Sequence, residues 1–192
     1  RIAVLPFDNM SGDANTDFLS DGISEEIINA LSGIDELKVT SRSSSFQFKG
    51  KNAPIKEIVE ELNVNAVLEG SVRLAGDTVR ISAKLIQAKD DFYFWSKSWD
   101  RTLDNILELQ DEISLLVADQ LREQLGHFDI EPHLVHQHTQ DISAYTLSLK
   151  AHYHLNQWNF EAVNKAIELY EEALTLDPSH LESLIGLADA YS

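Results

Sequence analysis

The apolar and polar positions of residues 1–126 follow two periods, one typical of strands and one typical of helices. Short apolar or alternating runs predict strands at residues 2–7, 37–41, 66–74, 78–87 and 92–99. Apolar residues three and four positions apart predict helices at residues 18–31, 54–62 and 105–125. The sequence therefore predicts a mixed-sheet α/β (α+β) domain with the order β-α-β-α-β-β-β-α and helices packed on one sheet.

The hairpin of residues 66–87 has the strongest local signal. Apolar and polar side chains alternate on its second strand, and Gly76 and Asp77 supply the turn. The strand that follows carries Tyr93, Trp95 and Trp99 at positions of one parity. We expect these rings to pack in the core, which is commoner than an exposed aromatic binding strip.

After Gly126 the periodic pattern stops. Residues 127–141 contain Pro132 and several histidines without an apolar period, so we predict a domain at 1–126 and a linker at 127–141. Helical periodicity returns at Ile142 and continues to the end of the chain. The third predicted segment is therefore an all-α region at residues 142–192.

In residues 142–192, small and large apolar residues recur at helical spacing and a proline closes the unit. The residues concerned are Ala151, Ala166, Tyr170, Ala173 and Pro178, followed by Leu184, Ala188 and Tyr191. This order resembles the tetratricopeptide repeat, whose period is about 34 residues, with one complete and one truncated copy. Placing Ala151 in register requires about three extra residues near residues 157–159, which departs from that period. The resemblance implies a stacking and protein- or peptide-binding segment.

Residues 1–126 resemble the TolB amino-terminal-like domain. The motifs that carry the resemblance are IAVLPF (2–7), DGISEEI (21–27), SRSSSF (41–46), KGK (49–51), VLEGSVR (67–73), DRTL (100–103) and LQDEI (109–113). In that family the domain is often followed by tetratricopeptide repeats. It is often preceded by a winged-helix DNA-binding domain or an adenylate/guanylate cyclase domain, sometimes with a membrane span between. The resemblance implies a bacterial signalling or regulatory protein, and it supplies no catalytic residues.

The composition excludes several classes of function. With 15 basic and 32 acidic residues the formal net charge is −17, which argues against direct nucleic-acid contact by this chain. Cysteine is absent, so disulfides and thiol chemistry are excluded. No apolar run approaches the roughly 18 residues of a membrane span. Cytoplasmic and periplasmic locations both stay open, as does a membrane tether in a parent protein.

Both ends of the chain have the character of internal positions. Arg1 leads directly into a predicted strand, and Ser192 interrupts the second helical repeat. We therefore expect a fragment of a longer protein. An apolar helix face exposed where the repeat is interrupted would favour a homodimer. The sequence does not decide the oligomeric state.

One loop is a candidate site for an anionic ligand. Hydroxyl groups and cations donate charge-assisted hydrogen bonds to phosphate. This loop supplies them from Ser41, Arg42, Ser43, Ser44, Lys49 and Lys51. No glycine-rich phosphate-binding fingerprint accompanies them. An ordered loop whose hydroxyls bind the local backbone is the competing interpretation.

Histidines gather in the predicted linker. His127, His133, His136 and His138 could offer imidazoles to zinc or nickel, with Asp129 nearby. No metal-site spacing organises them, so we predict a solvated linker without a metal site, and a pH-responsive hinge is the alternative. Neither a cofactor motif nor a nucleophile motif is recognisable, so we predict no catalytic residue and no cofactor.

These patterns favour a non-catalytic interaction and signal-input module, an acidic scaffold that binds a protein or peptide through its helical repeats. Two alternatives stay open. One is a sensor of a small anionic ligand, such as a nucleotide or phosphate. The other is the accessory region of a nucleotide cyclase whose catalytic domain lies elsewhere.

Overall fold

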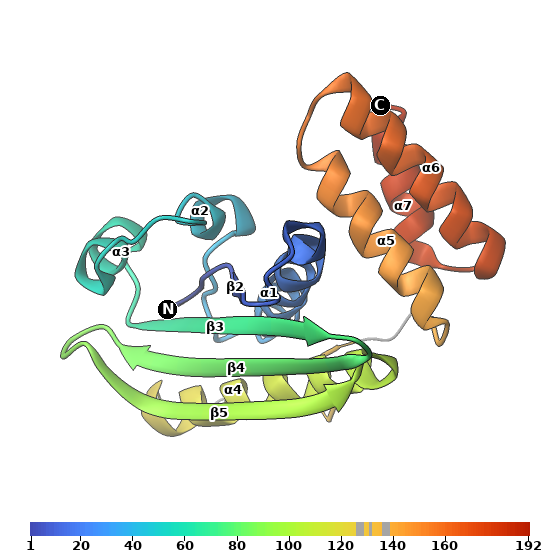
Figure 1. Cartoon of the computed structure of the whole chain (residues 1–192). Helices are drawn as coiled ribbons and strands as arrows, with labels where there is room; N and C mark the ends of the chain where they lie inside the picture. The colour runs from blue at the N-terminus through green and yellow to red at the C-terminus, as the bar shows by residue number, and fades with distance from the viewer. Residues whose placement is uncertain (126–128, 131, 136–138) are drawn as a thin grey trace. The chain divides into compact units, whose positions relative to one another are not determined.

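The computed structural model describes residues 1–125, 129–130, 132–135 and 139–192. It divides into two compact units, Arg1–Val135 and His136–Ser192, and each is described by itself (Figure 1). The division falls within the linker predicted at residues 127–141. Leu134 and Val135 belong to the first unit because their backbone N–H groups donate to Asp111.

A five-stranded mixed sheet organises the first unit. Its strands are β1 (Ile2–Val4), β2 (Asp8–Asn9), β3 (Ala66–Ala75), β4 (Thr78–Gln87) and β5 (Phe92–Thr102). Their order is β1-β3-β4-β5, and β2 also pairs with β3. Figure 1 shows β3, β4 and β5 as a long antiparallel meander, while β1 and β2 run parallel to β3.

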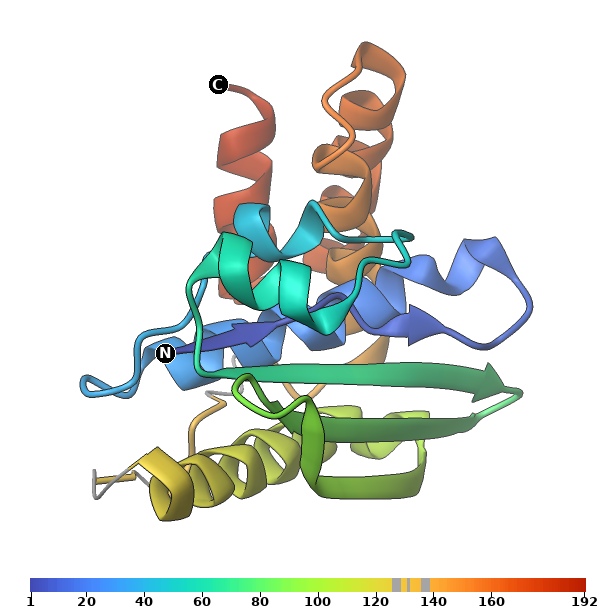
Figure 2. The same ribbon diagram turned by 90° about the vertical axis from the view of Figure 1, so that its left-hand side faces the viewer.

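The helices of this unit are α1 (Asp17–Ser32), α2 (Arg42–Phe46), α3 (Ile55–Leu62) and α4 (Ile106–Leu125). Short 3₁₀ turns, Ala14–Thr16 and Leu103–Asn105, precede α1 and α4. Helix α1 contacts α4 and the parallel strands, and α4 also contacts β5 (Figure 2). The core between them includes Ile81 and Leu85 of β4, both fully buried.

The opposite side of the sheet carries a second, smaller core. It joins Val67 of β3 and Ile86 of β4 to Ile58 of α3. The apolar stripe predicted on this helix packs there, since Ile55, Val59 and Leu62 border the same cluster. Helix α3 therefore covers one end of a sheet face that also carries Glu69, Ser71, Ser82 and Lys84.

The helices predicted at 18–31, 54–62 and 105–125 are confirmed as α1, α3 and α4, and the 66–87 hairpin is confirmed as β3 and β4. Gly126, after which the periodic pattern of the sequence stops, lies outside the described residues.

The strand predicted at residues 37–41 is wrong, and so is the exact element order. Val39 forms only a single parallel bridge with Ile2. The chain then turns away because Ser41 caps α2, where a loop was predicted. Asp8 and Asn9 add the short strand β2, which is not among the predicted strands.

Within residues 139–192, the second unit contains the helices α5 (Ile142–Leu155), α6 (Phe160–Leu176) and α7 (Leu181–Ala190). Asp141 caps α5 by accepting from the N–H groups of Ser143 and Ala144, and Asn159 caps α6 by accepting from that of Ala162. Each cap satisfies N–H groups that lack a partner within the helix.

Small side chains allow these helices to approach closely. Ala151 and Ala166 are fully buried against Leu155, Leu169 and Tyr170 in one cluster. Ala173 is also fully buried, whereas four other members of the predicted repeat set, Pro178, Leu184, Ala188 and Tyr191, are exposed. The set therefore separates into a packed group on α5 and α6 and an exposed group that begins after α6.

Candidate functional site

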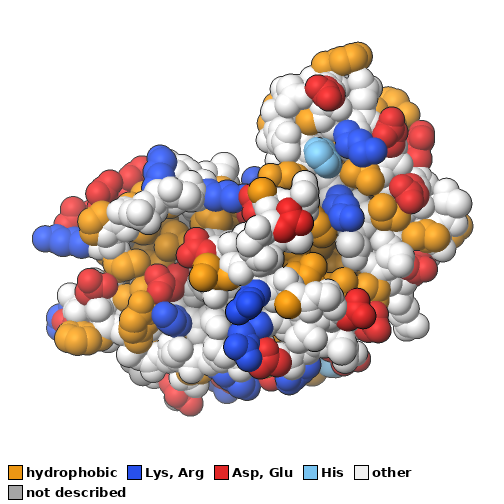
Figure 3. All heavy atoms as spheres, in the orientation of Figure 1, with side chains coloured by type: hydrophobic (Ala, Val, Ile, Leu, Met, Phe, Trp, Pro, Cys, Tyr) orange, Lys and Arg blue, Asp and Glu red, His pale blue; other side chains and the backbone are white. Residues whose placement is uncertain are grey.

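A groove of about 690 Å³ lies on the polar side of the sheet in the first unit. Its floor is made by β3 and β4, and residues 5–10, 48–53, 55 and 58 contribute to its walls. In Figure 3, the hollow between α3 and the strands shows hydrophobic side chains inside and charged ones around it. We call this feature the sheet groove.

Strand alternation explains the polar floor. Leu68 and Leu85 point to the core that α1 and α4 cover, so their neighbours Glu69 and Lys84 point to the groove. Further along, Ser71 pairs with Ser82, and both line the groove.

The charged pair Glu69 and Lys84 is organised by Tyr93 of β5. Tyr93 Oη donates a hydrogen bond to Glu69 Oε1 at 2.9 Å, and Lys84 Nζ lies 4.9 Å from the centre of the Tyr93 ring. This hydrogen bond and the nearby Glu69 charge raise the pKa of Tyr93. Lys84 therefore lies over an aromatic ring rather than in an ion pair with the opposite carboxylate.

One wall of the groove is a turn that carries two lysines. Phe48 is buried in the smaller core and anchors the turn, and Gly50 has a φ of 69°, which favours glycine. Lys49 and Lys51 flank this glycine, and both line the groove.

Lys49 is already engaged by α1. Its Nζ lies 2.5 Å from Asp21 Oδ2 and 4.0 Å from Asp17 Oδ2. Burial raises the pKa of Asp21, and the hydrogen bond from Lys49 opposes that effect only in part. Lys49 therefore stabilises a buried carboxylate.

The other residues of the predicted anion site have structural contacts. Ser41 Oγ accepts from the Ser44 N–H at 3.4 Å and donates to Ser44 Oγ at 3.1 Å, and Ser43 is exposed. Arg42 Nε donates to Glu25 Oε2 at 2.8 Å, and its guanidinium lies 4.1 Å from the Phe46 ring centre. None of these four residues, 41–44, lines the sheet groove.

The structure thus divides the predicted set. Lys49 and Lys51 line the groove, while Ser41, Arg42, Ser43 and Ser44 belong to the start of α2. Sequence reasoning missed Lys84, Ser71 and Ser82. The alternation of β3 and β4 could have placed them on one face, but no local signal shows which loop covers that face.

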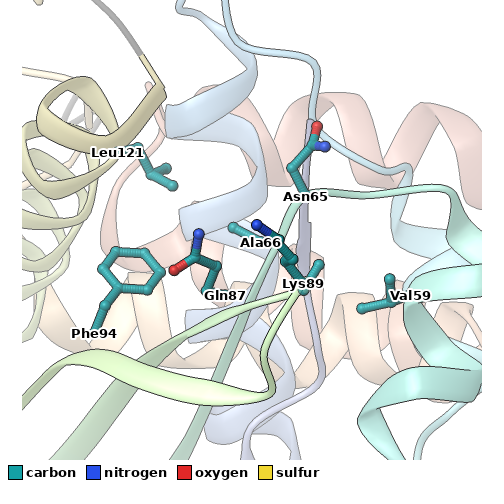
Figure 4. A pocket seen from close by; sticks show the side chains of 8 residues that line it. Val59, Asn65, Ala66, Gln87, Lys89, Phe94 and Leu121 are labelled. Atoms are coloured by element: carbon teal, nitrogen blue, oxygen red, sulfur yellow. The ribbon is translucent and has the colours of Figure 1, made fainter.

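A second pocket of about 420 Å³ lies where β4 leads into β5. Figure 4 shows Phe94 and Leu121 extending toward each other beside Gln87, with Val59 and Lys89 farther along. It offers one cation, Lys89, and no carboxylate among its lining residues.

The aromatic prediction is only partly right. Trp99 is buried, at 2% exposure, but Tyr93 is 58% exposed. A register shift opposite Leu85 and Ile86 breaks the alternation of β5, so Tyr93 pairs with Ile86 while Trp95 pairs with Leu85. The bulge therefore places Tyr93 on the groove side of the sheet.

Among the predicted linker histidines, only His133 lies within the described residues; His127, His136 and His138 fall outside them. His133 Nδ1 lies 2.8 Å from Asp111 Oδ2. Burial would raise the pKa of Asp111, but the hydrogen bonds from His133, Val135 and Leu134 outweigh it and lower that pKa. In the described part of the chain, no group of three or more His, Asp or Glu residues is placed to hold a metal ion.

None of the described helices is both long enough and apolar enough to cross a bilayer.

Two comparisons place the sequence among known proteins. A family model described as "HilA/YgeH-like transcriptional regulator, second domain" matches residues 1–116. A relative from Rhizobium meliloti (strain 1021), "Putative adenylate cyclase 3", is 37% identical over 193 residues, covering 98% of this chain and 33% of the relative. The chain thus spans about a third of the length of that relative.

Several solved structures resemble part of this chain at low sequence identity. Lipoprotein GNA1162 from Neisseria meningitidis is 20% identical with a TM-score of 0.45, over 65% of this chain and 95% of that one. TolB from Acinetobacter baumannii is 15% identical with a TM-score of 0.46, over 64% and 28%. The LpoB C-terminal domain from Escherichia coli is 13% identical with a TM-score of 0.42, over 53% and 81%.

The matching family model is described as a regulator domain. The resemblance of residues 1–126 to the TolB amino-terminal-like domain stays a prediction beside it. The resemblance of residues 142–192 to the tetratricopeptide repeat stays a prediction.

Proposed function

We propose that this chain, which belongs to the HilA/YgeH-like transcriptional regulator family by its second domain, is a non-catalytic interaction and signal-input module. The parent is a bacterial signalling or regulatory protein. The α/β unit relays or senses a signal, and the helical unit binds a protein or peptide. The regulator family and the cyclase-named relative support the regulatory role.

The observation that carries the binding role is the second apolar face of α7. One face of this helix packs on α6, where Gly186 fits against the ring of Tyr170. The other exposes Leu181, Leu184 and Ile185, with 45%, 46% and 53% of their surfaces accessible. A helix that is apolar on two faces is suited to packing between two neighbours.

A comparison of α7 with α5 supports a helix as the binding partner of the exposed face of α7. Leu181, Ile185 and Ala188 of α7 each follow a buried residue of α5 by 37 positions. These earlier residues, Ala144, Ser148 and Ala151, lie on the helix that packs against α6. We therefore expect the exposed stripe of α7 to accept an amphipathic helix like α6, as in a stacked helical repeat.

A peptide with the sequence of residues 160–176 tests this proposal directly. It should bind the 192-residue chain saturably in fluorescence anisotropy, and Ile185→Glu should weaken the binding at least tenfold, because a charge would be buried in the interface. Trp158→Ser is the matched control, since Trp158 is also exposed but lies outside α7. Equal binding by both variants would exclude α7 as the binding surface.

The accessory region of a nucleotide cyclase is the second candidate. The name of the 37% identical relative favours it, and the catalytic domain would then lie in the rest of the parent. Under this proposal the 192-residue chain makes no cyclic AMP from ATP in the presence of Mg²⁺ or Mn²⁺, as measured by liquid chromatography. Formation of cyclic AMP by the purified chain would overturn the non-catalytic assignment.

Four finer points belong to the same proposal. The module makes no direct contact with nucleic acid, works in the cytoplasm or the periplasm, and is tethered to a membrane only through other parts of the parent. A homodimer would form through the exposed stripe of α7. Light scattering of the chain and of Ile185→Glu at several concentrations measures whether that stripe self-associates.

A further inference from the structure

We propose that the sheet groove binds a small amphipathic anion, a carboxylate or phosphate group that carries an apolar part. This inference concerns the first unit alone and does not depend on the binding role proposed for the helices. Its basis is the coincidence of an apolar wall, two available lysines and an uncapped helix start in one groove.

The groove has the size and the wall of a ligand site. Its volume of about 690 Å³ falls within the range of roughly 300 to 1,000 Å³ typical of small-molecule pockets. Leu5, Phe7, Phe48, Ile55 and Ile58 line it with apolar side chains, of which Ile55 is the most accessible. An apolar ligand portion bound there would be removed from water, which is the main source of affinity for such groups.

Two lysines of the groove have no ion-pair partner within the described residues. Lys51 is exposed on the turn after Gly50, and Lys84 lies over the Tyr93 ring. Lys49 differs because Asp21 holds it. The available positive charge therefore comes from the turn on one wall and from β4 on the floor.

Helix α3 begins at the groove without a side-chain cap. Pro54 occupies the N-cap position and makes no side-chain hydrogen bond to the helix. Ala53 and Ile55 line the groove, so the first turn of α3 borders it. The N–H groups and the dipole at a helix start favour a negative group, which here adds to the two lysines.

The lining also carries three carboxylates, Asp8, Asp17 and Glu69, so the place of an anion depends on where each of them is held. Asp17 accepts a hydrogen bond from Asn9 Nδ2 at 2.6 Å, and Glu69 accepts one from Tyr93. Asp8 lies on β2, on the other side of β3 from the strand that carries Lys84. We therefore place the anionic group beside Lys51, Lys84 and the start of α3.

Four probes separate the contributions of charge and apolar surface: hexyl phosphate, hexanoate, 1-hexanol and inorganic phosphate. Each is titrated into the ¹⁵N-labelled 192-residue chain and followed by NMR. We expect saturable shifts of the Ser71 and Ser82 amides with hexyl phosphate or hexanoate, and at least tenfold weaker binding of 1-hexanol and of inorganic phosphate. Equal binding of 1-hexanol, or no shift with either anion, would overturn the proposal.

Charge-removing variants locate the anionic group. Lys84→Gln and Lys51→Gln should each weaken binding of the anion about tenfold, the size expected for one lost charge-assisted hydrogen bond. Lys56→Gln is the matched control, because Lys56 is exposed on α3 but does not line the groove. If Lys56→Gln weakens binding as much as the other two, general charge attraction explains the result and the site assignment fails. Unchanged amide spectra of the unliganded variants show that the fold is intact.

Discussion

Glu112 of α4 accepts a hydrogen bond from Trp99 of β5, with Trp99 Nε1 at 2.9 Å from Glu112 Oε1. Lys97 Nζ and Arg101 Nη2 also lie 3.3 Å from its carboxylate oxygens. The Glu112 carboxylate thus links α4 to three side chains of β5, the last strand in the sheet order. Since Trp99 is buried, its ring N–H requires this acceptor.

Replacing Glu112 by Ala should lower the free energy of unfolding by about 1 to 3 kcal/mol, because the Trp99 N–H is left without a partner. Glu108→Ala is the control, as Glu108 is exposed on the same helix. Urea unfolding followed by tryptophan fluorescence measures both. A loss no greater than that of the control would show that water replaces the carboxylate.

The same carboxylate predicts a pH dependence. Burial would raise the pKa of Glu112, but the hydrogen bonds from Trp99 and Lys97 and the nearby charges lower it below the ordinary value of 4.5. A lowered folded-state pKa stabilises the protein above the unfolded value, and this contribution is lost as the pH falls through the folded pKa. Between pH 7 and pH 3, wild type should therefore lose more stability than Glu112→Gln, as measured by urea unfolding at each pH.

Asp111 should control the order of the segment that ends the first unit. In Asp111→Ala, the N–H groups of Leu134 and Val135 lose their acceptor, so their hydrogen exchange should accelerate at least tenfold. Asp119→Ala is the control, because Asp119 pairs with Arg122 on the same helix. Unchanged exchange at both amides would mean that Asp111 does not hold this segment.

Gly186 should be essential for packing in the helical unit. A Cβ atom at this position would overlap the ring of Tyr170, which is only 1% exposed. Gly186→Val should destabilise the second unit by about 1 to 3 kcal/mol, while the exposed change Ala188→Val costs little. Hydrogen exchange of α5 and α6 amides, compared with β3 and β4 amides, measures the effect by unit. Equal loss in both units would contradict their separate cores.

Lys49 should be needed to compensate Asp21. Lys49→Met leaves the buried carboxylate without its cation, which should cost about 2 kcal/mol at pH 7. Because burial raises the pKa of Asp21 above its ordinary value of 3.8, the loss should shrink as the pH falls and the carboxyl becomes protonated. The double variant with Asp21→Asn should recover most of the stability in thermal unfolding. A double variant no more stable than Lys49→Met would show that the lysine acts through another contact.

The candidate site could be predicted only in part. The local spacing of hydroxyls and lysines pointed to residues 41–51, and Lys49 and Lys51 do border the groove. Arg42 has a different role because Glu25, from a helix earlier in the chain, neutralises it. Lys84 enters the groove from a strand 33 positions after Lys51, and no short-range pattern relates the two.

Periodicity alone determined the three main helices of the first unit and the central hairpin, because each buries a stripe or a face that its own sequence defines. It also indicated the close helix packing at Ala151 and Ala166. The tertiary structure decided that Val39 forms one bridge rather than a strand, that a bulge turns Tyr93 toward the groove, and that Asp111 binds residues 133–135. These features depend on partners distant in sequence, whose pairing is selected by the packing of the whole unit rather than by local preference.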